Sequence, residues 1–279
     1  FTLQAAKFKE LMKILALGDV VGRPGRNFLS ENLKSFKQRE NVDFCIANGE
    51  NAAGGAGLTA KTAYELKSAG VDLLTLGDHV WDQKNFDNEI DDLDFVCRPA
   101  NLPESNPGRD RIISTVGESR IAVFTVLGRS FMGPKVACPF KTAEHMLNEL
   151  TDKADLIVCE IHAETTSEKE SIGWFLDGRV HLVFGTHTHV PTADGRILPK
   201  GTAYQTDLGM TGPRESVLGR DIDACLGRFL DGMPRKCPVA EKDVGMQGCM
   251  IETESVGDGT IKVLSHQRID FREDNKVSN

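Results

Sequence analysis

Ile14-Leu15-Ala16-Leu17-Gly18-Asp19-Val20-Val21 is an apolar run that only a Gly-Asp pair interrupts. Such a short continuous run predicts a strand that is buried on both faces of a sheet. Two similar runs follow at 42–47 and 71–76, and helical patterns occupy 24–40 and 60–69 between them. Strands that alternate with helices indicate a sheet with parallel strands. This part of the chain therefore predicts an α/β fold.

The rest of the chain adds strands and helices in a less regular order. Strands are expected at 111–116, 121–127, 156–161 and 180–184, helices at 140–152 and 168–176, and a final pair of β segments at 246–253 and 260–269. Gly117-Glu118-Ser119 and Gly257-Asp258-Gly259 are turn sequences that join consecutive strands into hairpins. We expect a single domain over residues 12–279, preceded by an N-terminal extension or an expression remnant at 1–11.

Composition and charge restrict the possible functions. The 279 residues include 33 Lys and Arg against 41 Asp and Glu, which gives a net charge of −8. Broad nucleic-acid binding needs a basic face, so this balance argues against it. No apolar run reaches the roughly 18 residues of a membrane span, and the N-terminus lacks the cleavage pattern of a signal peptide. Seven cysteines without a CxxC pair are typical of reduced thiols, so we expect a cytoplasmic protein.

Polar side chains follow the predicted strands at the point where each strand ends. They are Asp19, Glu50 with Asn51, Asp78 with His79, His162, and His187 with His189. Sites in open α/β sheets form at the carboxyl ends of strands, and carboxylates together with imidazoles suit Fe, Mn, Zn or Co. A single Asp or His in such a position is more often a turn former or a structural residue. Agreement among five strand ends favours a metal site.

The His187-Thr188-His189 sequence is compatible with one metal ion or with two. Residues i and i+2 of a strand point to one face, so both imidazoles can bind one ion or each can bind a different ion. Two ions about 4 Å apart can share a bridging carboxylate, from Glu50 or Asp78, and a bridging hydroxide that attacks phosphorus in line. The other three histidines, His145, His181 and His266, are expected to be structural or exposed.

Seven sequence blocks in a fixed order resemble the bacterial YmdB-like branch of the calcineurin-like metallophosphoesterases. The blocks are 18–26, 48–55, 77–82, 98–101, 162–169, 185–194 and 206–213, and the similarity extends over about residues 12–270. The resemblance implies a four-layer α/β/β/α sandwich with two metal ions, iron being expected first and manganese or zinc as alternatives. It also implies a phosphodiesterase whose substrates are small cyclic nucleotides, most of all 2′,3′-cyclic nucleotides.

The resemblance also implies a role for each site residue. The implied ligands are Asp19 and His189 for one ion, Glu50 as the bridge, and Asp78, His162 and His187 for the second ion. Asn51 matches a residue that contacts metal or phosphate, and His79 matches the general acid, which contacts the substrate. In the implied reaction a bridging hydroxide attacks phosphorus and His79 gives a proton to the departing ribose oxygen.

One residue departs from the family pattern. The family has Gly-Asn-His where this chain has Gly77-Asp78-His79. An aspartate adds a negative charge beside the ions, so we expect altered turnover and metal preference. Asp82 is expected to orient the ring of His79.

Three further features of the site are open to interpretation. Arg98 and Arg214 are candidates for contact with substrate. The glycines of 54–57 either cradle a phosphate or allow a tight turn over the metals, and the turn is favoured. The loop around 206–220 is a candidate contact in a homo-oligomer.

Three other functions are weighed against the phosphodiesterase. A phosphomonoesterase or nucleotidase of the same superfamily would use the same metals with a different pocket. A non-catalytic regulatory protein would use bound metal or nucleotide as a signal, and Asp78 keeps that interpretation open. A dinucleotide-binding enzyme is disfavoured, because the first strand–helix turn, Gly-Asp-Val-Val-Gly-Arg-Pro-Gly, does not fit GxGxxG.

Overall fold

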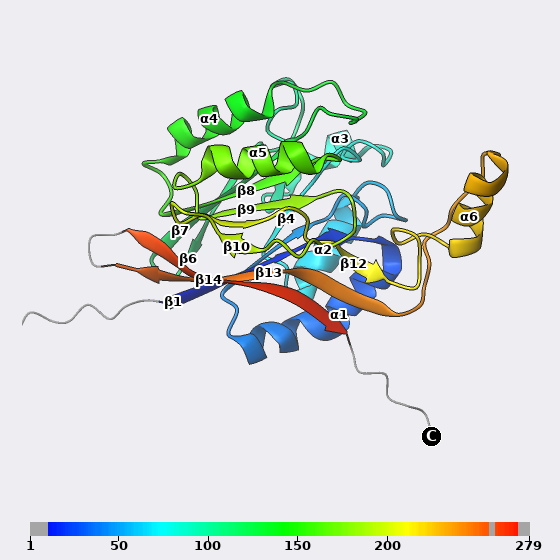
Figure 1. Cartoon of the computed structure of the whole chain (residues 1–279), viewed down its shortest axis with the longest axis horizontal. Helices are drawn as coiled ribbons and strands as arrows, with labels where there is room; N and C mark the ends of the chain where they lie inside the picture. The colour runs from blue at the N-terminus through cyan, green and yellow to red at the C-terminus, as the bar shows by residue number, and fades with distance from the viewer. Residues whose placement is uncertain (1–10, 257–259, 273–279) are drawn as a thin grey trace, which may run out of the picture.

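Two β-sheets pack face to face between two layers of helices in the computed structural model, which describes residues 11–256 and 260–272 (Figure 1). The helices α4 (Pro139–Leu150) and α5 (Thr166–Leu176) cover one sheet, and α1 (Gly22–Glu40) and α2 (Ala60–Ala69) cover the other. The predicted four-layer α/β/β/α sandwich is therefore confirmed. No helix in the described residues is both long and apolar enough to cross a membrane.

The first sheet has eight strands within the described ranges. In spatial order they are β2 (Asp19–Val20), β12 (Met210–Pro213), β13 (Val244–Ser255), β1 (Leu11–Leu17), β3 (Phe44–Asn48), β4 (Leu73–Thr75) and β5 (Val96–Cys97), with β14 (Ile261–Arg272) paired to β13. The strands β1, β3 and β4 are parallel, as predicted, and the short strand β5, which was not predicted, runs parallel to β4. The turn predicted at Gly257-Asp258-Gly259 lies outside the described residues, as do residues 1–10 of the predicted extension, and Leu11 already belongs to β1.

The second sheet has six strands in the same part of the chain. Their order is β10 (Arg196–Ile197), β11 (Ala203–Gln205), β9 (Leu182–Thr186), β8 (Leu156–His162), β7 (Ser119–Leu127) and β6 (Ile112–Val116). The predicted hairpin is confirmed as the antiparallel pair β6–β7, and β7, β8 and β9 run parallel. Short helical segments, α3 (Phe86–Glu89) and Ile90–Asp92, lead into β5.

The strand β1 shows why its sequence is apolar at nearly every position. Leu15 and Leu17 belong to the core beneath the helices, whereas Ile14 and Ala16 belong to the core between the two sheets. Successive side chains of a strand point to opposite faces, so a strand covered on both faces needs a continuous apolar run. A third core lies beneath α4 and α5.

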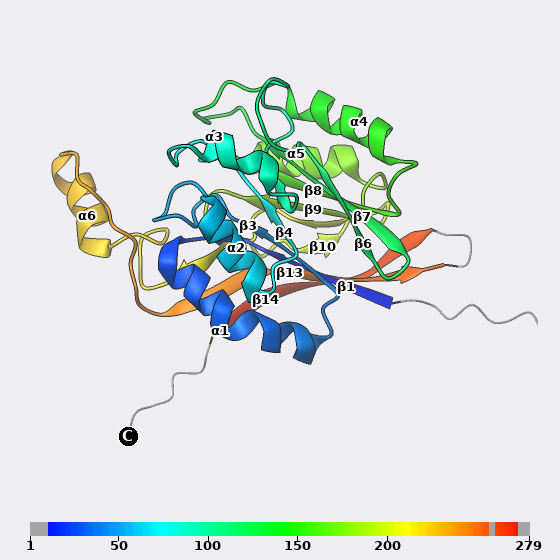
Figure 2. The same ribbon diagram turned by 180° about the vertical axis from the view of Figure 1, so that it is seen from behind.

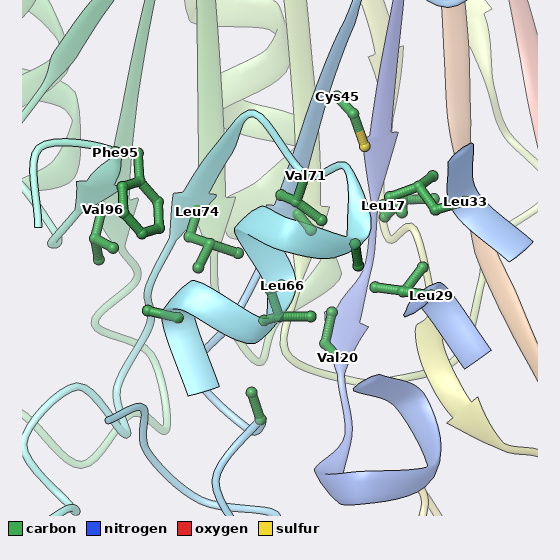
Figure 3. Close-up of a cluster of buried hydrophobic side chains, with 14 of the residues drawn as sticks. Leu17, Val20, Leu29, Leu33, Cys45, Leu66, Val71, Leu74, Phe95 and Val96 are labelled. Carbon is green, nitrogen blue, oxygen red and sulfur yellow. The ribbon is translucent and has the colours of Figure 1, made fainter. Parts of the chain in front are cut away.

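The helices α1 and α2 hold the first sheet at its outer face. Figure 3 shows Leu29 and Leu33 of α1 and Leu66 of α2 against Leu17 of β1 and Leu74 of β4. All five side chains are fully buried. Full burial of each such side chain stabilises the fold by about 1.5–3 kcal/mol, so this layer fixes the positions at which β1, β3 and β4 end.

The apolar run at residues 14–21 forms parts of two strands, β1 and β2, rather than one strand. At Gly18 the chain passes so close to Gly209 that a Cβ atom would overlap the Gly209 carbonyl group. Only glycine permits this approach. The chain then continues as β2, where the N–H of Asp19 donates to the carbonyl oxygen of Gly209 at 3.2 Å. The break therefore places Asp19 beside Met210, at the start of β12.

The helix α6 (Ile222–Asp231) was not predicted. It stands away from the sandwich in both Figure 1 and Figure 2, and Cys225 is its one buried residue. The short strands β10, β11 and β12 were not predicted either. Strands of two to four residues carry no periodic pattern, and α6 covers no core that would impose one.

Candidate active site

The predicted polar residues meet at one end of the sandwich, where strands of both sheets end. Asp19 lies in β2, and Glu50 and Asp78 follow β3 and β4, all in the first sheet. His162 ends β8 and His187 follows β9, both in the second sheet. The site therefore takes its side chains from both sheets, at the end of the sandwich where these strands end.

Four residues form a compact group of potential metal ligands. One ligand atom from each of Glu50, Asp78, His162 and His187 lies within 4.8 Å of the other three. His162 Nε2 is 2.9 Å from Asp78 Oδ1 and 3.1 Å from Glu50 Oε1. His187 Nδ1 is 3.2 Å from the same Asp78 oxygen. Two carboxylates and two imidazoles that converge in this way fit a divalent cation.

Asp19, Asn51 and His189 form a second group beside the first. His189 Nε2 lies 3.0 Å from Asn51 Oδ1 and 3.8 Å from Asp19 Oδ1. Asp19 is fully buried, and its Oδ2 accepts a hydrogen bond from the N–H of His187. Its Oδ1 has no hydrogen-bond partner among the described residues. A buried carboxylate oxygen without a partner is costly, and a cation at this position would satisfy it.

Negative charge governs the electrostatics of both groups. Burial alone would lower the pKa of His162, but the charge of Glu50 and the hydrogen bond with Asp78 raise it well above its ordinary value. Burial opposes the ionisation of Asp78, yet His162 and His187 hold the pKa of that carboxyl below its usual range. Burial raises the pKa of Asp19. The site therefore favours added positive charge, which is what a metal centre needs.

Glu160 sets the tautomer of His162. The hydroxyl of Thr186 donates to Glu160 Oε1, so the Thr186 oxygen accepts the proton of His162 Nδ1 at 2.8 Å. In the neutral ring Nε2 of His162 then has the lone pair that a metal ligand needs, and without a metal the raised pKa of His162 keeps a proton on Nε2. Asn48 Nδ2 also donates to Glu160, and burial raises the pKa of Glu160 to about 7. The sequence signal is a carboxylate two residues before His162, on the same face of an apolar strand.

A buried ion pair supports the loop that carries His187 and His189. Both histidines have left-handed backbone angles, with φ of 95° and 62°. Asp207 Oδ2 accepts from the N–H and the hydroxyl of Thr188 at 3.2 and 2.8 Å, and from Lys169 Nζ at 2.6 Å. The turned backbone places His187 in the first group and His189 in the second. A straight strand would have pointed both imidazoles to one face.

His79 is a protonatable side chain at the edge of this site. Its Nδ1 is 2.7 Å from Asp82 Oδ2, as predicted, so the carboxylate accepts the Nδ1 proton. The N–H of His79 donates to Glu50 Oε2 at 3.1 Å. Partial burial would lower the pKa of His79, but the charge of Glu50 and the Asp82 hydrogen bond raise it. The remaining nitrogen, Nε2, is free to carry a proton that can be donated.

A cavity of about 780 Å³ opens beside the two groups. Glu50, Asn51, His79, His187 and His189 line its polar side. The opposite wall comes from residues 217–237, which include α6. The pocket therefore has a charged floor and a largely apolar wall, the usual character of a site for a small organic anion.

Comparison with known proteins places this arrangement in a family. The model of the YmdB-like protein family matches residues 15–265. The chain belongs to the YmdB-like family. A relative from Bacillus subtilis (strain 168), named 2′,3′-cyclic-nucleotide 2′-phosphodiesterase, is 43% identical over 263 residues, which cover 94% of this chain and 98% of the relative.

Two solved structures are similar to this YmdB-like chain. A hypothetical protein from Thermus thermophilus has 38% identity and a TM-score of 0.86, over 94% of this chain and 100% of that one. A novel phosphatase from Mycoplasma pneumoniae has 36% identity and a TM-score of 0.87, over 96% of this chain and 95% of that one. The similarity in sequence and fold thus extends over nearly the whole chain.

The two arginines predicted near substrate in this YmdB-like chain have other partners. The guanidinium group of Arg98 is buried and donates to the carbonyl oxygens of Pro99, Asn106 and Pro107. That of Arg214 pairs with Asp270. Neither residue lines the cavity, so this prediction was wrong. An arginine side chain is long and flexible, so the direction in which it points does not follow from its position in a motif.

The arginines that do line the cavity are Arg220 and Arg228. The guanidinium group of Arg220 donates to the carbonyl oxygen of Gly55, which also accepts from Asn51 Nδ2. Gly54 and Gly55 have positive φ, at 68° and 95°, as the predicted tight turn requires. The glycine loop of this YmdB-like site therefore links Asn51 to Arg220 in the cavity wall, through the carbonyl oxygen of Gly55.

Proposed function

We propose that this chain is a metal-dependent phosphodiesterase that hydrolyses 2′,3′-cyclic nucleotides with two metal ions. The observation that carries the proposal is the pair of adjacent ligand groups that share one cavity with His79, one of them with an unpartnered buried oxygen on Asp19. The printed activity of the Bacillus subtilis relative supports the substrate class.

The ligands divide between the two ions according to the two groups. Asp19 and His189 would hold one ion, and Asp78, His162 and His187 would hold the other. Glu50 would serve both ions, and Asn51 would contact the first ion or the phosphate. The mixed donor set suits iron first, with manganese and zinc as alternatives. When bound, the ions supply Lewis-acid activation of the phosphoryl group and of the attacking water.

His79 supplies the proton in the proposed reaction. Asp82 holds the Nδ1 proton, so the ring presents Nε2–H to the cavity when it is charged. A protonated imidazole can give that proton to the departing ribose oxygen. Asp82 acts through His79 and is a positioning residue.

The cavity wall fits the rest of a nucleotide. Arg220 and Arg228 place positive charge opposite the ligand groups. Guanidinium groups in this position can pair with the phosphate. Phe229 and Met233 add apolar surface for a base, and Phe229 is 85% exposed. The apolar surface and the charges together favour a nucleotide over a small phosphate ester that has no base.

Anaerobically purified protein tests the proposal by elemental analysis and by hydrolysis of a nucleotide panel. We expect about two metal ions per chain and faster turnover of 2′,3′-cyclic AMP than of 3′,5′-cyclic AMP or a 5′-nucleotide. Preference for the 5′-nucleotide would support the nucleotidase alternative instead. Binding of metal and nucleotide without hydrolysis would support a regulatory protein.

The replacement His79→Ala tests the acid role. Loss of a general acid costs about 10²–10⁴ in rate, and it matters most for esters with poor leaving groups. We expect hydrolysis of 2′,3′-cyclic AMP to fall far more than that of a nitrophenyl phosphodiester. Equal losses on both substrates would rule out proton donation by His79.

A further inference from the structure

Two cysteines line the same wall of the cavity. Cys225 lies in the first turn of α6, and Cys237 lies in the segment that returns from that helix. The side chain of Cys225 is nearly covered, whereas that of Cys237 is half-buried and open to small molecules. Cys138 is also half-buried, but it does not line this cavity.

The other four cysteines lie inside the sandwich. They are Cys45, Cys97, Cys159 and Cys249. Burial raises the pKa of each of these thiols, to about 12 for Cys45 and Cys249. A thiol that stays protonated and enclosed does not react with oxidants. The cavity wall therefore differs from the core in its cysteine chemistry.

The backbone holds the two cavity thiols near each other. The N–H of Asp221, the N-cap of α6, donates to the carbonyl oxygen of Pro238 at 2.9 Å. Arg220 and Val239 form an antiparallel bridge beside it. The N–H of Cys225 donates back to the Asp221 carbonyl at 3.1 Å. These contacts hold the start of α6 against the residues that follow Cys237. Residues 226–236 form the loop of chain between these two positions.

Positive charge faces one thiol of the pair. Arg228 Nη1 is 3.8 Å from Cys237 Sγ. Burial opposes the ionisation of Cys237, but hydrogen bonds from Arg228 and Cys225 and the charges of Arg228 and Arg220 lower the pKa of this thiol. Burial and the neighbouring Cys237 raise the pKa of Cys225. One thiol is thus suited to attack an oxidant, and the other is suited to resolve the product.

We propose that Cys225 and Cys237 form a redox modification site, in which peroxide converts the pair into a disulfide bond that ties α6 to its return segment and narrows access to the cavity.

The proposed reaction proceeds in two steps. The Cys237 thiol first releases its proton, and the thiolate attacks one oxygen of hydrogen peroxide. The O–O bond breaks, the sulfenic acid of Cys237 is formed, and the departing hydroxide takes up the released proton to give one water. The Cys225 sulfur then attacks the sulfenic sulfur, its proton goes to the departing hydroxide, and a second water leaves. Two thiols lose two electrons in total, and peroxide accepts them. A small dithiol such as dithiothreitol reverses the change by exchange.

Peptide mass mapping of the full-length reduced protein after treatment with hydrogen peroxide tests the first half of the proposal. We expect one linked pair of peptides that contains Cys225 and Cys237, lighter by two hydrogen atoms and separated again by dithiothreitol. In Cys225→Ser, Cys237 should accumulate as sulfenic acid that dimedone traps. The matched control Cys138→Ser should form the bond as the parent protein does. The replacement Arg228→Gln should slow it about tenfold, because less thiolate is present.

Two outcomes of the mapping would overturn the site. One is oxidation of Cys138 while Cys225 and Cys237 stay reduced. The other is a bond between two chains in place of the internal one. Either result would show that the two thiols are not paired in solution.

Turnover of the metal-loaded enzyme tests the second half, and this readout rests on the proposed phosphodiesterase function. We expect the disulfide form to show a KM for 2′,3′-cyclic AMP raised about threefold or more, with little change in kcat. The double variant Cys225→Ser/Cys237→Ser should show no change after peroxide. An unchanged KM in fully bonded parent enzyme would overturn the effect on access. Absence of all turnover in the reduced enzyme would contradict the proposed function and leave the mapping result standing.

Discussion

Asp78 places one carboxylate oxygen between two imidazoles, at 2.9 Å from His162 Nε2 and 3.2 Å from His187 Nδ1. An asparagine of the same shape would keep an oxygen ligand and remove a unit of negative charge. A unit charge a few ångströms from a cation is worth several kcal/mol even at an effective dielectric constant near 20. The departure from the Gly-Asn-His pattern would therefore change the affinity for metal more than the shape of the site.

The replacement Asp78→Asn is expected to weaken retention of the second metal ion by about tenfold or more, and to change phosphodiesterase turnover. Metal content after dialysis against a chelator and kcat under saturating metal measure the two effects. Equal metal content and equal rates in the two forms would contradict the importance of this charge.

Asp82→Asn is expected to lower kcat about tenfold with little change in KM, because Asp82 positions His79 without touching substrate. The pH profile gives the sharper test. A general acid must be protonated, so under the proposed role of His79 activity should fall as the pH rises through the pKa of His79. Asp82 raises that pKa, and its loss should move the alkaline limb to lower pH. The exposed control Asp87→Asn should leave the limb in place, and a limb that does not move in Asp82→Asn would refute the interaction.

Single residues of this site were predictable to the extent that strands position them. Each proposed ligand follows an apolar run, and parallel strands bring such positions to one edge. Glu160 and Lys169 act through hydrogen bonds to other residues, and their partners Thr186 and Asp207 are distant in sequence. Arg220 was missed because its position depends on a loop that has no pattern of its own.

At the scale of elements, the loop after β9 depends on α5. Lys169 in α5 and Asp207 are both fully or almost fully buried, and their ion pair holds Thr188 between the two site histidines. Removal of one partner leaves a buried charge without compensation. Such a loss costs roughly 3–5 kcal/mol.

Lys169→Met is therefore expected to lower the unfolding free energy of the metal-free protein by roughly 3–5 kcal/mol, as measured by urea denaturation in the presence of a chelator. The matched control is Lys242→Met, which breaks an exposed pair with Glu215. Loss of such an exposed pair should cost less than about 1 kcal/mol. Similar values for the two variants would mean that the buried pair does not stabilise the loop.

The helices and strands were predicted where each has a core to face. The strand β1 and the helix α1 carry clear apolar patterns because layers cover them. The break at Gly18 was not visible, since it results from the approach of Gly209 rather than from any local preference. The order of strands in the first sheet was also out of reach, because β13 inserts between β12 and β1 from the far end of the chain.

At the scale of the whole molecule, α6 and its return segment are separable from the sandwich. Replacement of 222–237 by a short Gly-Ser linker removes one buried side chain and most of the apolar cavity wall. We expect the unfolding free energy to change by less than about 2 kcal/mol, and kcat/KM for 2′,3′-cyclic AMP to fall about tenfold. A small nitrophenyl phosphodiester should be affected much less. An equal fall on both substrates would point to damage at the metal site instead of loss of the wall.

The position of the proposed ligands on both sheets has a thermodynamic consequence. A bound ion would crosslink the two sheets of the sandwich, because its proposed ligands come from both. By mass action, free metal at about a hundred times its dissociation constant would add about 2.7 kcal/mol to folding. The melting temperature should then rise with metal concentration in calorimetry, and Asp78→Asn should flatten that rise. The heat tolerance of this protein would thus report how much metal its surroundings provide.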